Sequence, residues 1–124
     1  MPDRRRLELL FVEDDALVRL TVAMMLEDHG FHVAEAATGE AALGLLESGL
    51  GVDALVSDID LGPGIDGLVL AERVRALRPG LPVVFVTGRP SALRDHPRRA
   101  GEAYVPKPFD ADTLARLVRD LAAA

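Results

Sequence analysis

The sequence predicts an α/β fold, in which a five-stranded parallel sheet lies between two layers of helices as a three-layer, doubly wound sandwich. The first observation is that short β-compatible runs alternate with segments of helical spacing along the whole chain. The second is length, because 124 residues suit one domain. Alternating elements form right-handed crossovers between parallel strands, and a barrel built in this way needs roughly twice as many residues.

The first half of the chain contains three expected strands and two expected helices. Residues 7–12 form a short apolar run without regular polar alternation, which is typical of a strand buried on both faces. Leu17, Leu20 and Met24 recur at helical spacing, and we expect the methionines to serve helix packing. The expected elements are strands over 7–12, 31–36 and 54–57, a helix over 16–28, and a helix over 40–47 that opens near Thr38.

The second half of the chain repeats the alternation, with one irregular segment. A loop over 60–67 contains three glycines and a proline, which is typical of a shaped turn. Residues 88–101 contain Pro90 and Pro97, so we expect the fourth of five helices to be short or irregular. The other expected elements are a helix over 68–77, strands over 83–87 and 103–105, and a last helix over 111–122 that Asp110 can cap.

The composition excludes several classes of protein. No run of about 18 apolar residues could span a bilayer, so we expect a soluble protein without a membrane partner. The first six residues lack the apolar segment of a secretory signal, and we interpret them as a short solvated arm. The absence of cysteine excludes disulfides and suits the cytoplasm. A net charge of -6 argues against direct binding of nucleic acid, and the three histidines are expected at surfaces or helix ends.

Polar side chains follow or end four of the expected strands. They are Glu13 and Asp14, Asp58, Thr87 and Lys107. Ligands of open parallel sheets bind at the carboxyl ends of strands, so we expect these residues to converge. Clustered carboxylates repel one another unless a cation offsets their charge. With only oxygen donors nearby, the pattern predicts a magnesium site, in which manganese could substitute.

This cluster also predicts a chemistry. An aspartate beside a divalent cation can attack phosphorus and form an acyl phosphate, and Asp58 is the candidate nucleophile. Lys107, the only lysine of the chain, and the Thr87 hydroxyl could stabilise the charge on the phosphoryl oxygens. Taken singly, each residue has an ordinary structural explanation, such as an acidic group at a helix N-terminus. Their joint order and spacing favour the functional interpretation.

Four segments, LLFVEDD, LVSDIDLGPGIDG, VVFVTG and YVPKPF, resemble the successive signature segments of two-component response-regulator receiver domains. The resemblance covers essentially the whole chain and implies a flavodoxin-like sheet with strand order 2-1-3-4-5. It implies that the protein is a signalling phosphoacceptor rather than an enzyme with its own substrate. The domain would catalyse only its own phosphoryl uptake and slow loss, and would switch a surface bound by an unknown downstream protein.

The resemblance also implies roles for individual residues and partners. Asp58 would accept the phosphoryl group from a phosphohistidine of a sensor histidine kinase or a histidine phosphotransfer protein. The implied magnesium ligands are Glu13, Asp14, Asp58 and the backbone carbonyl of Asp60. Thr87 and Lys107 would contact the phosphoryl group. Tyr104 would change rotamer on phosphorylation, and the peptide bond before Pro108 would be cis.

One segment departs from the pattern, and two alternatives remain open. The commonest receivers have a longer and more regular fourth helix than residues 88–101 allow. Because the chain ends soon after its last helix, we expect a single receiver domain over 1–124, without an output domain. One alternative is a receiver fold that only docks and is not phosphorylated. The other is a haloacid-dehalogenase-like phosphatase, because Asp58 and Asp60 imitate its DxD motif, although Gly62 stands where that family has threonine.

Overall fold

Five parallel strands form one sheet in the computed structural model, which describes residues 6–97 and 99–123. The expected solvated arm over the first six residues lies almost entirely outside this range. In chain order the elements are β1 (Glu8–Val12), α1 (Ala16–Asp28), β2 (His32–Ala36), α2 (Gly39–Glu47), β3 (Ala54–Asp58), α3 (Gly67–Leu77), β4 (Val83–Thr87), η1 (Pro90–Leu93), β5 (Glu102–Pro106) and α4 (Ala111–Ala123).

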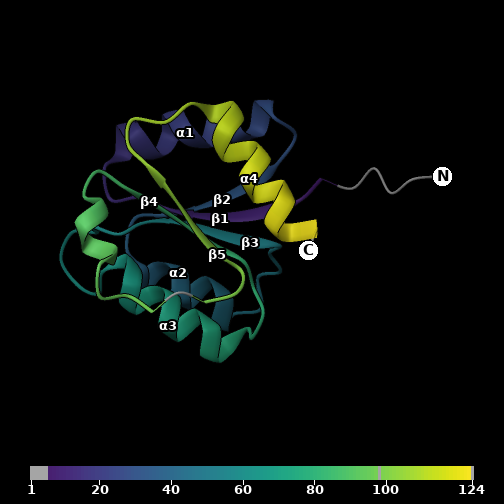
Figure 1. Cartoon of the computed structure of the whole chain (residues 1–124). Helices are drawn as coiled ribbons and strands as arrows, with labels where there is room; N and C mark the ends of the chain where they lie inside the picture. Colours follow the sequence, from purple (N-terminus) through teal and green to yellow (C-terminus); the bar gives the residue numbers. More distant parts are fainter. Residues whose placement is uncertain (1–5, 98, 124) are drawn as a thin grey trace.

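The strand order is β2-β1-β3-β4-β5, and every neighbouring pair is parallel. Helices α1 and α4 cover one face of the sheet, and α2 and α3 cover the other (Figure 1). This confirms the predicted three-layer sandwich and its strand order. The expected helix count needs a correction, because the described residues form four α-helices and one 3-10 helix, η1. None of the described helices is long and apolar enough to cross a membrane.

The sheet separates two apolar clusters, because successive side chains of a strand point to opposite faces. Leu9 and Phe11 of β1 pack on the side of α1 and α4. Leu10 and Val12 of the same strand pack on the side of α2 and α3. The central strands β3 and β4 are buried along their whole length. This explains why their sequences are nearly continuous apolar runs.

The exposed face of α1 differs from the expected one. Its buried residues are Val22, Ala23 and Leu26. Three of the four apolar residues that predicted the helix are exposed instead, with 74% of Leu17, 53% of Leu20 and 59% of Met24 accessible to solvent, whereas Met25 is half-buried. The expectation that Met24 serves helix packing was therefore wrong, although the bounds of the helix were predicted correctly. An apolar stripe remains on the surface of α1.

His29, at the C-terminal end of α1, ties this helix to α4. Its Nδ1 lies 2.8 Å from the carbonyl oxygen of Met25, and its Nε2 lies 2.5 Å from a carboxylate oxygen of Asp112. Both partners can only accept hydrogen bonds, so the arrangement requires a proton on each ring nitrogen, which is the charged imidazolium. The hydrogen bond that His29 donates to Asp112 is the main reason why the pKa of His29 is raised above its ordinary value.

We therefore expect the His29 contact to depend on pH in a defined direction. A raised folded pKa means that the contact stabilises the fold fully below the unfolded pKa of histidine and loses this effect as pH rises through the folded value. An NMR titration of the His29 ring should give a lower midpoint in Asp112→Ala than in the parent protein. Asp120→Ala, which removes a carboxylate from the same helix, should leave the midpoint unchanged. Equal midpoints in the parent and Asp112→Ala would contradict the assignment.

Candidate functional site

The carboxyl ends of β1, β3, β4 and β5 bring the predicted polar residues to one edge of the sheet. Glu13 directly follows β1, Asp58 ends β3 and Lys107 directly follows β5. The Lys107 Nζ lies 2.8 Å from Asp58 Oδ2 and 3.4 Å from Glu13 Oε1. Asp58 and Glu13 lie 49 and 94 positions before Lys107 in sequence, and both contact its ammonium group. The convergence follows from the parallel topology, which places the carboxyl ends of all strands at the same edge of the sheet.

A third carboxylate, that of Asp14, lies beside the two that contact Lys107. Carboxylate oxygens of Glu13, Asp14 and Asp58 all lie within 4.8 Å of one another. Glu13 and Asp58 are only 4% and 5% exposed, so water screens their repulsion poorly. Burial is the main cause that raises the pKa of Glu13 above its ordinary value. Burial alone would lower the pKa of Lys107, but the hydrogen bond and charge of Asp58, together with Glu13, raise it on balance.

The donor set fits a hard divalent cation. All three side chains offer oxygen, and ligands about 2.1 Å from a magnesium ion lie at most about 4.2 Å apart across it. The observed spacing of up to 4.8 Å is close enough for small side-chain movements to bring the three carboxylates onto one ion. One lysine cannot balance three carboxylates, so a second positive charge would relieve the remaining repulsion.

The loop between β3 and α3 closes over this cluster. A Cβ atom added to Gly62 would lie 3.0 Å from Asp14 Oδ2, so the backbone of the loop passes directly beside that carboxylate. Asp60 donates its N–H to Asp58 Oδ1 at 3.1 Å. On the far side, Glu40 of α2 accepts the N–H of Ile65 at 3.0 Å, and this hydrogen bond lowers the pKa of Glu40. Sequence reasoning missed Glu40, because nothing local to it indicates a loop 25 residues away.

A bidentate ion pair spans the loops after β3 and β4. Arg89 Nε lies 3.0 Å from Asp60 Oδ2, and its Nη2 lies 2.5 Å from Asp60 Oδ1. The hydrogen bond from Arg89 is the main cause that lowers the pKa of Asp60. The backbone N–H of Arg89 also donates to Thr87 Oγ1 at 2.8 Å. The sequence did not predict this pair, and its only signal is that opposite charges stand two residues after Asp58 and Thr87.

The remaining predicted residues lie beside the cluster or outside it. Thr87 is fully buried, and its carbonyl accepts the N–H of Lys107 at 2.7 Å. The peptide bond between Lys107 and Pro108 is cis, which is the geometry that the resemblance implies. Tyr104 does not join the carboxylates, because it pairs with Phe85 in the sheet and is 47% exposed. It lies two residues before Pro106, the register partner of Thr87.

Comparisons with known proteins agree with this geometry. Residues 9–119 match the family model of the response regulator receiver domain. The sensor kinase CckA of Brucella abortus (strain 2308) is 35% identical over 116 residues, which are 91% of this chain and 12% of that protein. The crystal structure of the receiver domain from the hybrid histidine kinase CckA is 38% identical, covers 93% of this chain and 98% of that one, and has a TM-score of 0.78.

A further solved structure bears on the metal. The response regulator protein TrrA from Thermotoga maritima, crystallised in complex with Mg²⁺-BeF, is 30% identical and has a TM-score of 0.83. The alignment covers 92% of this chain and 97% of that one. The chain spans between 12% and 50% of the length of the curated relatives that it matches. The likeness therefore concerns this domain and not the remainder of those larger proteins.

Proposed function

The chain belongs to the response regulator receiver domain family, and we propose that Asp58 is its phosphoacceptor. The phosphoryl donor is a phosphohistidine of a sensor histidine kinase or of a histidine phosphotransfer protein. The contact that carries this proposal is the 2.8 Å hydrogen bond from Lys107 to Asp58, inside a group of three carboxylates of which Glu13 and Asp58 are buried. A lysine held at the carboxylate of a strand-end aspartate is placed to meet the oxygens of a phosphoryl group bound there.

The transfer exchanges one bond for another. A carboxylate oxygen of Asp58 attacks phosphorus, and the bond from phosphorus to the donor imidazole nitrogen breaks. The nitrogen keeps the electron pair of that bond, and an acyl phosphate remains on Asp58. Lys107 stays in place and donates to a phosphoryl oxygen. Glu13, Asp14, Asp58 and the carbonyl of Asp60 would hold a magnesium ion, which would supply positive charge to offset the carboxylates and the phosphoryl group, and manganese could replace it.

Two further residues are proposed to transmit the phosphorylated state. Thr87 Oγ1 accepts a hydrogen bond from Arg89, and its own proton is available to a phosphoryl oxygen. Movement of Thr87 towards that oxygen would change the end of β4, beside Tyr104 on β5. We assign Tyr104 the role of a surface residue that changes rotamer in response. Slow attack of water on phosphorus, catalysed by the domain itself, then breaks the bond to the carboxylate oxygen, releases inorganic phosphate and returns Asp58 to its starting state.

A protein-sized donor also needs a surface beside Asp58. Helix α1 begins two residues after Asp14, and its exposed stripe of Leu17, Leu20 and Met24 leads away from the acidic cluster. A contiguous patch of exposed apolar residues often marks a surface that contacts another protein. This stripe supports a partner that approaches along α1, as a phosphohistidine-bearing protein would. A small phosphodonor would have no need of it.

The wider biology is proposed on the same basis. We assign residues 1–124 to a single receiver domain that acts in the cytoplasm and passes its signal to a downstream protein by contact. Direct binding of nucleic acid has no support in the charge of the chain, which is -6. The haloacid-dehalogenase-like alternative has no support in the matched family, which is that of receiver domains. The alternative to be tested is a receiver fold that docks to a partner without being phosphorylated.

The direct test is an NMR comparison with magnesium and beryllofluoride, which mimics a bound phosphoryl group. Amide resonances around Asp58, Thr87 and Tyr104 should shift in the parent protein and stay unchanged in Asp58→Asn. Magnesium alone should shift the resonances of Glu13 and Asp14. The absence of any change with beryllofluoride, in a protein that binds magnesium, would favour the docking module.

Lys107→Ala should separate metal binding from phosphoryl binding. The substitution removes the ammonium group but none of the proposed magnesium ligands. The magnesium Kd should therefore change by less than about tenfold, which corresponds to about 1.4 kcal/mol. Phosphoryl uptake should fall by about 10² to 10³-fold, because one charge partner of the phosphoryl oxygens is lost. Magnesium titrations followed by NMR and uptake from acetyl phosphate give the two values. Lys107→Arg keeps the charge and should fall between the two proteins, and an uptake equal to that of the parent in Lys107→Ala would contradict the role.

A further inference from the structure

Arg19 of α1 contacts the residue that directly follows β1. Its Nη1 donates to the carbonyl oxygen of Glu13 at 2.9 Å, and its Nε lies 3.4 Å from Oε1 of Glu35 on β2. Helix α1 packs against both of these strands (Figure 1). One guanidinium group therefore joins three elements beside a proposed magnesium ligand, although Arg19 itself has no part in the phosphoryl chemistry proposed for Asp58.

Every polar group of Glu13 has a partner. Its N–H donates to the carbonyl oxygen of Ala36 at 3.1 Å, which extends the pairing of β1 with β2 by one residue. Its carboxylate accepts from Lys107 through Oε1 at 3.4 Å, and from the backbone N–H of Asp15 through Oε2 at 3.1 Å. Its carbonyl oxygen is the atom that Arg19 binds. The backbone and the side chain of Glu13 are thus held from four directions, one of which is α1.

The carbonyl that Arg19 binds belongs to the peptide group between Glu13 and Asp14. This group is planar, so a bond to its oxygen restricts the orientation of the whole peptide unit. Both residues that it joins are proposed magnesium ligands, and their carboxylate oxygens lie within 4.8 Å of each other. A rotation of this plane would move the two carboxylates relative to each other. Arg19 is therefore placed to control their relative orientation.

Glu35 holds the guanidinium group in the plane that this contact needs. A guanidinium group presents its N–H donors in a rigid fork, so a partner at Nε restricts the direction of Nη1. The side chains of Arg19 and Glu35 are 21% and 34% exposed, so water screens the pair only in part. Lysine carries one flexible ammonium group and could satisfy only one of the two acceptors.

We propose that Arg19 is a positioning residue of the magnesium site, with Glu35 holding its guanidinium group. By fixing the peptide group between Glu13 and Asp14, Arg19 directs both carboxylates towards one cation. Replacing residues that hold metal ligands in place typically weakens metal binding by roughly 10 to 100-fold. This inference rests on the proposed magnesium site, and it extends the control of that site to α1 and β2.

The sign of the change in magnesium affinity separates positioning from charge. Arg19 is positive and lies beside an acidic cluster, so its charge alone opposes a second cation, and Arg19→Gln would then tighten magnesium binding. Loss of positioning has the opposite effect. We expect the magnesium Kd of Arg19→Gln to rise by about tenfold or more, as measured by NMR titration. Arg19→Lys keeps the charge and one contact, so its Kd should lie between the two. An unchanged or lower Kd in Arg19→Gln overturns the proposal.

Arg78→Gln is the matched control for the contact with a carbonyl. Nη2 of Arg78 donates to the carbonyl oxygens of Leu46 and Leu50 at 3.0 and 2.8 Å, and the residue is half-buried, as Arg19 is. The two variants therefore lose the same kind of bond. Urea unfolding should show a loss of stability in both, whereas only Arg19→Gln should bind magnesium more weakly. A similar rise of the Kd in Arg78→Gln overturns the proposal, because general destabilisation would then explain it.

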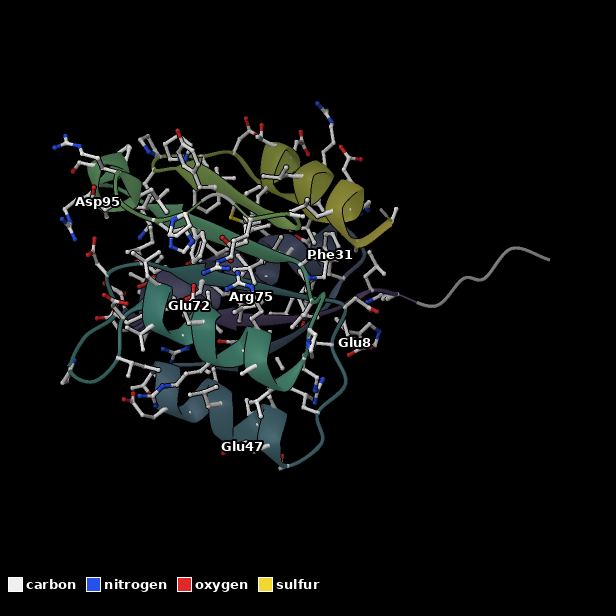
Figure 2. The ribbon with its side chains drawn as sticks, turned by 60° about the horizontal axis from the view of Figure 1, so that its bottom comes forward. Glu8, Phe31, Glu47, Glu72, Arg75 and Asp95 are labelled. Carbon is white, nitrogen blue, oxygen red and sulfur yellow. The ribbon has the colours of Figure 1, made fainter. Side chains whose placement is uncertain are left out.

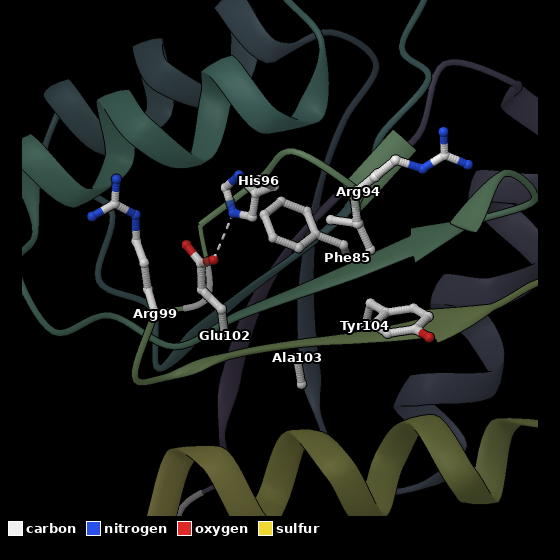
Figure 3. Close-up of a pocket in the computed structure, with 8 residues that line it drawn as sticks. Phe85, Arg94, His96, Arg99, Glu102, Ala103 and Tyr104 are labelled. Atoms are coloured by element: carbon white, nitrogen blue, oxygen red, sulfur yellow. Dashed lines mark hydrogen bonds and ion pairs between the residues drawn. The ribbon is translucent and has the colours of Figure 1, made fainter. Parts of the chain in front are cut away.

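Arg75→Gln is the matched control for the contact with a carboxylate. Arg75 pairs with Glu72 of the same helix at 3.1 Å (Figure 2), and with Glu102, whose hydrogen bond with His96 is drawn in Figure 3. Its loss should leave the magnesium Kd unchanged.

Glu35→Gln removes the carboxylate partner of Arg19 and should raise the magnesium Kd severalfold. The double variant of Arg19→Gln with Glu35→Gln should bind no more weakly than Arg19→Gln alone, because Glu35 acts through Arg19. Additive losses would overturn this role of Glu35 and show that it acts through its charge.

A measurement without metal keeps this inference distinct from the proposed function. In the metal-free parent protein, the amide order parameters of Glu13 and Asp14 should be close to the value of about 0.85 that is typical of rigid backbone. They should fall in Arg19→Gln and stay unchanged in Arg78→Gln. Equal values in the parent and Arg19→Gln overturn the proposal. A parent protein that binds no magnesium would refute the proposed metal site itself, and the order parameters would then decide alone whether Arg19 holds the acidic pair.

Discussion

Replacing Asp58 with asparagine should abolish phosphoryl uptake from acetyl phosphate and from a phosphohistidine donor alike. The amide is neutral and cannot form an acyl phosphate, so the loss should reach at least about 10³-fold. The substitution keeps the shape of the side chain and removes one of three crowded carboxylates, so the fold should be retained. Intact mass spectrometry after incubation with magnesium and acetyl phosphate measures the result.

Asp15→Asn is the matched control for this experiment. Asp15 belongs to the same acidic run but caps α1, accepting the backbone N–H groups of Leu17 and Val18 at 3.0 and 3.1 Å. Asparagine is an equally good N-cap, so uptake should stay close to that of the parent. Normal uptake by Asp58→Asn would refute the assignment of the phosphoacceptor. Equal loss in both variants would indicate that general damage to the acidic edge, rather than a missing nucleophile, is being measured.

Gly67→Ala should lower the free energy of unfolding by about 3 kcal/mol or more. A Cβ atom at Gly67 would lie 2.2 Å from the carbonyl oxygen of Asp58 and 2.8 Å from the Cα of Ile59. Both atoms belong to the backbone, so no side-chain rotation relieves the overlap. The strand end that carries Asp58 would have to move, and phosphoryl uptake should fall as well. Urea unfolding gives the free energy.

Gly44→Ala provides the opposite result from the same chemical change. Gly44 lies inside α2, and an added Cβ meets nothing within 4 Å. Alanine should therefore stabilise the protein by about 0.5 to 1 kcal/mol through helix propensity. If Gly67→Ala also stabilised the protein, the close approach of α3 to Asp58 would be wrong. The pair of variants thus distinguishes steric overlap from the general effect of adding a methyl group.

The convergence of residues on one sheet edge was predictable from the sequence, whereas contacts between loops were not. Alternating strands and helices imply a parallel sheet, and parallel strands end together, so Glu13, Asp58 and Lys107 had to meet. The ion pair between Arg89 and Asp60 depends on the course of two loops, which propensity does not determine. The same is true of Glu40, whose partner is the backbone of a distant loop.

Helical spacing located α1 but not its buried face. Apolar residues lie on more than one side of this helix, so the spacing of Leu17, Leu20 and Met24 fits a helix without saying which side packs. The segment between β4 and β5 shows a related limit. Two prolines predicted that it would be short or irregular, but His96, expected at a surface or helix end, has a side chain that is only 10% exposed. Its burial depends on Glu102 and Phe85, which lie on different strands.

The isolation of Lys107 makes this domain unusually convenient to label. As the only lysine in the sequence, it is the single side-chain amine that an amine-selective reagent can modify. Its side chain is 33% exposed, so a small reagent can reach it, and it lies 2.8 Å from Asp58. Reductive methylation with isotope-labelled formaldehyde would therefore place one side-chain spectroscopic reporter beside the acidic cluster. Because dimethylation keeps the positive charge, the labelled methyl groups would register a cation or a phosphoryl analogue arriving next to them, without crowding from other lysines.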